Sequence, residues 1–283
     1  MTVTNSPART VTDGPARTLI SWPDSVGTGP AATARRVWDA LGTVRDPELD
    51  EPITDLQFVT SVDLGTTGSG IEVAIRLRLP TYFCAPNFAY LMVADAYDAV
   101  AALPEVGRTV VRLEDHFAAE EINDGVAARA GFTGSFPGLA VDELEELRRT
   151  FQRKAYLAAL ERMSRRLSAD GIGIDRFSAL TIGDLPTGHE LDSLVRRRGD
   201  LGLGSGHSEL VMVEHDGTPI GADILPKRLR FAKSVRVSIE GNGIFCRGLL
   251  TTRYGDDSTP GTGSSVGESD GTDLGMPTMR SES

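Results

Sequence analysis

The sequence predicts an α+β protein, in which a small two-layer domain of helix and sheet precedes a helical segment and a β-rich C-terminal region. The first part of the chain alternates in the order helix, strand, strand, helix, strand. The middle has long helical periodicity, and the last part has short alternating apolar runs between turn signals. We expect an α+β domain at 31–115, a helical connector at 116–170 and a β-rich region at 171–255. Disordered tails are expected at 1–30 and, with an acidic composition, at 256–283.

The α+β domain is predicted from local periodicity. Apolar residues at helical spacing define the first helix, and Pro47 ends it because the residue before a proline avoids the helical region. Alternating apolar residues then define a hairpin whose turn is the Gly/Thr/Ser run at 65–70. Pro86 suits an early helical position, where its missing N–H costs little. The predicted elements are helix 31–44, strand 57–64, strand 71–79, a helix from Pro86 to Leu103, and strand 109–113.

The predictions for the two later regions depend on different features of the sequence. Acidic residues at 142–146 and arginines at 162–166 predict a long helix over 141–168 with the charge order that a helix dipole prefers. In the β-rich region, Asp216-Gly217 is a hairpin signal. Alternation at 235–239, followed by Gly241-Asn242-Gly243, predicts a further hairpin that leads into a strand at 244–250. Cys246 then lies in the middle of a strand, where core packing is expected.

Composition excludes several classes of function. The chain has 283 residues and a formal net charge of −11, whereas binding to nucleic acid needs a basic surface. No apolar run reaches the length of a membrane span, and the N-terminus lacks the apolar core of a signal peptide. Two cysteines are too few for a disulfide scaffold. We therefore expect a cytoplasmic protein without a nucleic-acid or membrane partner.

Cys84 is the leading candidate for a functional residue. It stands where a predicted strand ends and a predicted helix begins, with Thr81 before it and Pro86 behind it. A thiol beside the N–H groups of a helix start has a lowered pKa, which makes it a better nucleophile or metal ligand. The alternative is a small apolar residue buried at a strand end.

Carboxylates near the first helix end are the second candidate group. Asp46 and Glu48 flank Pro47, and Asp55 follows shortly after. Solvated turns commonly carry such residues, and Asp55 could cap the next strand. The functional alternative is that these carboxylates lie near Cys84 and orient its thiol or a metal. Two other polar groups have simpler interpretations: His116 at a solvated helix start, and Arg196-Arg197-Arg198 at a basic helix end or a docking patch.

The segments 44–49 and 53–59, followed by the Thr-x-x-Cys step at Thr81 to Cys84, resemble the PaaD-like and SufT-like iron–sulfur cluster assembly factors. The resemblance covers about 31–115 and implies a two-layer α+β domain. It matches Cys84 to the family's functional cysteine, and Asp46, Glu48 and Asp55 to its signature carboxylates. Gln57 stands where the family usually has glycine, and Ala85-Pro86 replaces the more usual Cys-Pro order. The extended C-terminal part is similar to accessory proteins of bacterial multicomponent di-iron monooxygenases.

Ligand number limits what such a site could do. An iron–sulfur cluster takes four protein ligands, mostly thiolates, and Cys84 alone cannot hold one stably. Three arrangements stay open: two Cys84 residues across a homodimer, a ligand shared with a partner, or a role that never stores a cluster. A transient cluster or iron ion at Cys84 is the cofactor that we expect, with none stably bound by one chain.

The resemblance implies a non-catalytic accessory factor for maturation of a client metalloprotein, working with other assembly factors. The alternative from a different class is a scaffold protein that binds a partner enzyme without metal chemistry, through the helix at 141–168 and the last region. A thiol enzyme is a third hypothesis. It lacks support because the sequence ties no histidine to Cys84.

Overall fold

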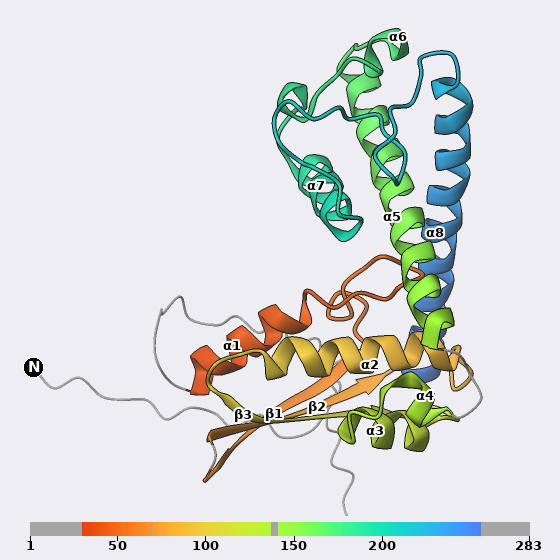
Figure 1. Cartoon of the computed structure of the whole chain (residues 1–283). Coiled ribbons are helices and arrows are strands. Elements are labelled where there is room, and N and C mark those ends of the chain that lie inside the picture. The colour runs from red at the N-terminus through yellow and green to blue at the C-terminus, as the bar shows by residue number, and fades with distance from the viewer. Residues whose placement is uncertain (1–29, 69, 137–140, 256–283) are drawn as a thin grey trace, which may run out of the picture. The chain divides into compact units, whose positions relative to one another are not determined.

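A three-stranded sheet covered by helices forms the first part of the chain (Figure 1). The computed structural model describes residues 30–68, 70–136 and 141–255, so the predicted tails lie outside the described residues, apart from Pro30. The predicted order of helix, strand, strand, helix, strand is confirmed. Its elements are α1 (Pro30–Leu41), β1 (Val59–Thr67), β2 (Gly70–Arg78), α2 (Pro86–Ala101) and β3 (Val106–Glu114).

The sheet has the order β1-β2-β3, with β1 antiparallel and β3 parallel to the central strand β2. The parallel pair needs a crossover connection, which α2 supplies. Alternate β2 residues Val73, Ile75 and Leu77 are buried in the core. On the other face Glu72 forms an ion pair with Arg108 of β3 at 3.0 Å. One face of the sheet is therefore covered and the other is polar, as the sequence predicts for a two-layer domain.

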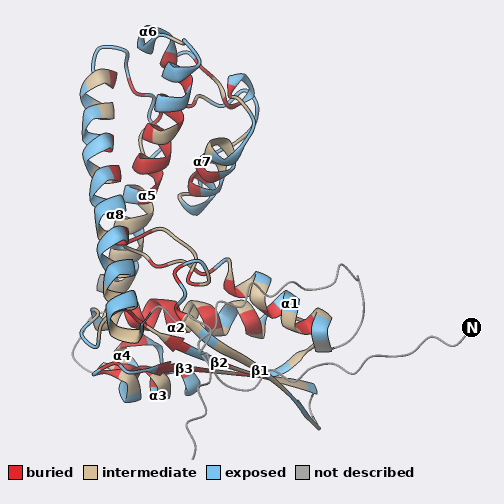
Figure 2. Ribbon diagram, turned by 180° about the vertical axis from the view of Figure 1, so that it is seen from behind, coloured by how far each residue is buried: buried red, intermediate tan, exposed pale blue. Residues whose placement is uncertain are grey.

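One hydrophobic core joins the sheet to its helices. Buried side chains of α1, α2 and the strands meet with those of α3 (Ala119–Ala127) and α4 (Gly131–Ser135). Figure 2 shows the buried residues along α2 and the sheet. The core positions from the helices include Val37, Leu41, Ala89, Val93, Ala96, Val100, Ile122 and Val126.

The second half of the described chain is helical, and the prediction of a β-rich region at 171–255 is wrong. The predicted helix over 141–168 is confirmed as α5 (Val141–Ala169). After it come α6 (Ile174–Phe177), the short 3₁₀ helix η1 (Ile182–Asp184), α7 (His189–Asp200) and α8 (Leu225–Tyr254). Within 171–255 β pairing is limited to the isolated bridges Thr181 to Leu210 and Val213 to Pro219. The second bridge closes the turn predicted at Asp216-Gly217.

The alternation in the sequence of α8 was misleading because a charged residue occupies its buried face. The buried residues of α8 recur at helical spacing: Leu225, Ala232, Arg236, Ile239 and Gly243. Arg236 is buried because it pairs with Glu161 of α5 at 2.5 Å. Val237, in contrast, is 52% exposed although it is apolar. An arginine inside and a valine outside remove the apolar period of 3.6 residues on which a helix prediction depends.

A second core lies among α5, α7, α8 and the loops between them. Tyr156 and Leu160 of α5 meet Leu194 of α7 and Val211 of the following loop. The Tyr156 hydroxyl donates a hydrogen bond to the Val213 carbonyl at 2.8 Å. Both views in Figures 1 and 2 show α5 and α8 side by side. None of the helices in the described part of the chain is long and apolar enough to cross a membrane.

Gln57 has a backbone conformation that favours glycine. Its φ is +61°, in the left-handed region, where a side chain meets steric resistance. Glycine adopts this conformation without a steric cost, because it has no Cβ atom. Gln57→Gly should therefore raise the free energy of unfolding by about 0.5–1 kcal/mol, measured by urea denaturation. The control is Gln57→Ala, which should give no such gain in the free energy of unfolding, since alanine keeps the Cβ atom. Equal stability of the glycine and alanine variants would contradict the explanation.

Candidate site around two thiols

Cys84 lies at the junction between β2 and α2, as the sequence predicts. The strand ends at Arg78, and α2 begins at Pro86 with Ala85 as its N-cap residue. Cys84 is half-buried and packs against the first core. Its Sγ atom lies 3.3 Å from the Thr81 Oγ1 atom, within hydrogen-bond distance. Thr81 therefore contacts the thiol directly and helps to fix its position.

His116 holds the backbone of Cys84 from the end of β3. Its Nδ1 atom accepts a hydrogen bond from the Ala118 N–H at 3.2 Å, so the proton is on Nε2, which donates to the Cys84 carbonyl at 2.8 Å. Only 5% of His116 is exposed, and burial lowers its pKa. The prediction of a solvated His116 is wrong. Because β2 and β3 are parallel, the segments after both strands lie at the same end of the sheet. This arrangement brings His116 to the segment 79–85 between β2 and α2, which we call the cysteine loop.

Three aromatic rings lie exposed beside the thiol. Phe83 is 77% exposed, and Tyr82 and Phe117 are also exposed. The ring centroids of Tyr82 and Phe83 are 5.1 Å apart, and those of Phe83 and Phe117 are 6.2 Å apart. We call these three residues the aromatic rim. An exposed group of large apolar side chains is typical of a surface that another protein covers.

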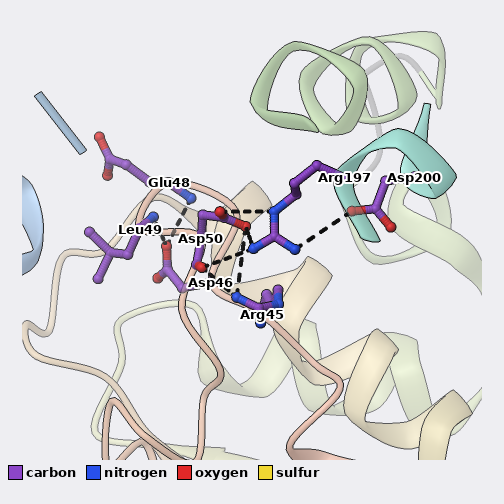
Figure 3. A network of polar contacts seen from close by, with 7 residues as sticks. All are labelled: Arg45, Asp46, Glu48, Leu49, Asp50, Arg197 and Asp200. Carbon is purple, nitrogen blue, oxygen red and sulfur yellow. Dashed lines mark hydrogen bonds and ion pairs between the residues drawn. The ribbon is translucent and has the colours of Figure 1, made fainter. Parts of the chain in front are cut away.

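Asp46 organises the loop that follows α1 (Figure 3). Its Oδ1 atom accepts hydrogen bonds from the backbone N–H groups of Glu48 and Leu49, both at 2.8 Å. The residue is only 9% exposed. Burial raises the pKa of the carboxyl from 3.8 to about 6, although the two backbone N–H groups act in the opposite direction. Asp46 thus shapes the loop at 46–51, which we call the carboxylate loop.

The other two predicted carboxylates point to different neighbours. Glu48 accepts a hydrogen bond on Oε1 from the Asn242 Nδ2 group of α8 at 3.0 Å. Asp55 is exposed and accepts a hydrogen bond from the Thr54 hydroxyl at 3.3 Å. Among the described residues, no hydrogen bond or ion pair connects Asp55 to the cysteine loop. Glu48 therefore links the loop to α8. A role for Asp55 near Cys84 stays a prediction from the resemblance.

Cys246 is the residue that the sequence interpretation missed. It lies on α8 rather than in a strand, is half-buried, and packs against the same core as Cys84. Burial is the main cause that raises the pKa of its thiol to about 11, and the charge of Asp46 acts in the same direction. Both cysteines therefore pack against one core, although they lie far apart in the sequence. The sequence offered no signal for this shared position beyond the fact that Cys246 is the second of two cysteines.

A buried ion pair fixes the carboxylate loop to α7 (Figure 3). The Arg197 Nη2 and Nε atoms lie 2.6 and 2.9 Å from the two carboxylate oxygens of Asp50. The Arg45 guanidinium also donates to the Asp50 carbonyl oxygen. Arg197 and Arg198 lie in the last turn of α7, so the predicted basic helix end is confirmed. Both are only 2% exposed, so neither is available for the alternative, a docking patch. Their charges are used inside the protein.

The described residues do not form a complete metal site. Within 30–68, 70–136 and 141–255, no three His, Cys, Asp or Glu side chains are grouped so that they could hold a metal ion. Thiolates are nevertheless the donors that iron–sulfur clusters prefer, and both cysteines of the chain pack against this one core. The donor chemistry fits iron or a cluster as cargo, with further ligands supplied from outside the group.

The chain was also compared with known proteins. Residues 34–112 match the family described as iron-sulfur cluster assembly protein. The match extends from within α1 to within β3 and includes Asp46, Glu48, Asp55, Thr81 and Cys84. It identifies the broad family, which is coarser than the PaaD-like and SufT-like resemblance. No curated protein matches the chain. Through residues 34–112 of its α+β domain, the chain is therefore similar to the iron-sulfur cluster assembly protein family.

Proposed function

We propose that the protein is a non-catalytic accessory factor that passes an iron–sulfur cluster or iron to a client metalloprotein, with Cys84 as a transient ligand. The observation that carries this proposal is the position of Cys84. Its thiol stands at an open strand-to-helix junction beside the exposed aromatic rim, in a domain of the iron–sulfur cluster assembly family. A half-buried thiol can bind cargo and still be reached by a partner.

The site favours a protein as the partner rather than a small molecule. A cleft of about 320 Å³ opens beside Asp46 between the carboxylate loop, α2 and α5, and Cys84 is not among its lining residues. The thiol instead adjoins Phe83 on the surface. His116 contacts the carbonyl oxygen of Cys84, so its ring is used to position the loop rather than to activate the sulfur. These features support transfer between proteins over thiol catalysis.

The client is proposed from the build of the whole chain. From its sequence the extended chain resembles accessory proteins of bacterial multicomponent di-iron monooxygenases, so we propose a component of such a system as the client. The ligands that Cys84 lacks would come from the client, another assembly factor or a second copy of this chain. A reducing cytoplasm is the proposed location, because it keeps the free thiols of Cys84 and Cys246 reduced.

Replacement of Cys84 tests the proposed function. Cys84→Ala should change the free energy of unfolding by no more than about 1 kcal/mol, because the side chain is small and half-buried. Metal content of the client in cells should fall to the level seen without this protein. Ser168→Ala removes one exposed heavy atom at the far end of α5 and is the matched control. A fully loaded and active client in cells that carry Cys84→Ala would exclude this function.

A scaffold protein is the second candidate, and exposed apolar residues on α8 favour it. Ile244 is 70% exposed, and Phe231 and Phe245 are exposed as well. Such residues suit a partner-binding helix that needs no metal. A client that copurifies with the Cys84→Ala variant and is normally loaded would support the scaffold. A client that copurifies but stays unloaded would support the maturation factor.

A further inference from the structure

We propose that Cys246 of α8 is a second ligand at the Cys84 site, so that one chain binds iron through two thiolates. This inference deepens the proposed function and rests on its assignment of Cys84 as a ligand. It brings the C-terminal half of the chain, which lies outside the family match, into the cargo site.

Contacts on both sides of Cys246 fix where this part of α8 lies. Before it, the Asn242 Nδ2 group donates to Glu48 Oε1 at 3.0 Å. After it, the Arg247 Nη1 group lies 2.7 Å from Glu51 Oε2. The stretch of α8 that holds Cys246 is therefore fastened to the loop that Asp46 organises.

The end of α8 is fastened close to the cysteine loop. The Tyr254 hydroxyl lies 2.7 Å from Asp115 Oδ2 and 3.4 Å from the Leu79 carbonyl oxygen. Leu79 follows β2 and leads into the segment that carries Cys84. Asp115 follows β3 and precedes the histidine that holds the Cys84 backbone. The last turns of α8 therefore run between the carboxylate loop and the cysteine loop.

The face of α8 that carries Cys246 is turned toward the domain. Cys246, Leu250 and Tyr254 are spaced four residues apart, so they share one face of the helix. Cys246 and Leu250 pack against the first core, as Cys84 does. Two thiols from elements distant in the sequence thus pack against one core, and the proposal is that they lie close enough to share a metal ion.

A metal cation is the ligand that this group of donors would suit. When a divalent ion binds, two sulfur–metal bonds form and the two thiol protons leave to solvent, with no change in oxidation state. Thiolates select soft or borderline metals, which include iron in clusters. Two protein thiolates also leave coordination positions open, as handover to a client requires.

The distance between the thiols can be tested without metal. Dibromobimane becomes strongly fluorescent when its two reactive carbons alkylate two neighbouring thiols. The reduced full-length protein should become fluorescent and gain the mass of one bridging group. Cys84→Ser and Cys246→Ser should each remain dark. Two separate adducts on the wild type, without fluorescence, would place the thiols too far apart and overturn the inference.

Anaerobic titration with Co²⁺ alone tests ligation. The wild type should show the near-ultraviolet charge-transfer absorbance of thiolate-bound cobalt. Each single serine variant should show about half of that absorbance per bound ion and at least about tenfold weaker binding. Ser234→Ala, at an exposed position of α8, is the control. A wild-type spectrum and affinity in Cys246→Ser, or no thiolate band in the wild type, would overturn the inference.

The client assay separates this inference from the proposed function. If Cys84→Ala abolishes client loading while Cys246→Ser leaves cobalt binding unchanged, the maturation role stands and the second ligand is rejected. If the client loads normally in Cys84→Ala, the maturation role is rejected whatever the cobalt spectra show. Loss of cobalt affinity in both variants, together with loss of client loading, supports both.

Discussion

Arg197→Ala is expected to lower the free energy of unfolding by about 3–5 kcal/mol, because it leaves the Asp50 carboxylate buried without its main partner. Arg197 contacts both carboxylate oxygens and is 2% exposed. The loop that Asp50 belongs to also presents Asp46 and Glu48, so its loosening should reach the thiol site. Urea denaturation at neutral pH measures the stability. Fluorescence of the dibromobimane-treated protein reports on the thiols.

The neighbouring arginine provides the control for this effect. Arg196 is exposed on the same helix, and Arg196→Ala should change stability by no more than about 0.5 kcal/mol. In Asp50→Asn/Arg197→Met the buried charge is gone, so the double variant should be more stable than Arg197→Met alone. Asparagine also tolerates the positive φ of 57° at this position. Equal destabilisation by Arg196→Ala and Arg197→Ala would show that the buried pair does not matter.

Asp46→Asn is expected to stabilise the protein near neutral pH by on the order of 3 kcal/mol and to remove a pH dependence of folding. Burial raises the pKa of Asp46 from 3.8 to about 6, so the folded state binds more protons than the unfolded state between these values. Stability from this group is therefore lost as pH rises through that window. Asparagine keeps the oxygen that accepts the Glu48 and Leu49 N–H groups but carries no charge. Urea denaturation across the window measures the difference.

A third variant separates the charge of Asp46 from its hydrogen bonds. Asp46→Ala removes both, so it should share the flat pH profile of Asp46→Asn and be less stable than it by about 1 kcal/mol, as for loss of a capping residue. A constant difference in stability between wild type and Asp46→Asn from acidic to neutral pH would contradict the buried charge. Equal stability of the asparagine and alanine variants would contradict the role of the two hydrogen bonds.

The α+β domain could be predicted because its signals are local. Val73, Ile75 and Leu77 alternate along β2, and each is buried as the period of a strand requires. Pro86 stands at the start of α2 for reasons of backbone geometry alone. Pro47 is a weaker marker, because α1 ends at Leu41, before the end at Val44 that the sequence predicts. The junction that carries Cys84 follows from the end of β2 and the start of α2. The sequence also indicated the family, through residues that the match at 34–112 includes.

Residues whose environment comes from distant parts of the chain could not be predicted in this way. His116 is buried because parallel pairing of β2 and β3 brings it to the Cys84 carbonyl. Arg197 is buried because Asp50, far away in the sequence, receives it. In both cases the side chain alone indicates a solvated position, since burial of a polar group is favourable only with a partner.

The sequence by itself determined the small α+β domain, its junction cysteine and its similarity to the iron–sulfur cluster assembly family. Only the tertiary structure decided that residues 171–255 are mainly helical and that Cys246 packs against the same core as Cys84. The physical reason lies in α8, where Arg236 is buried by Glu161 and Arg247 pairs with Glu51. Their partners lie on α5 and on the loop after α1, so neither position shows an apolar signal in the local sequence. Where polar residues make the contacts of a helix, apolar periodicity does not predict it, and only the packed chain places Cys246 against the first core.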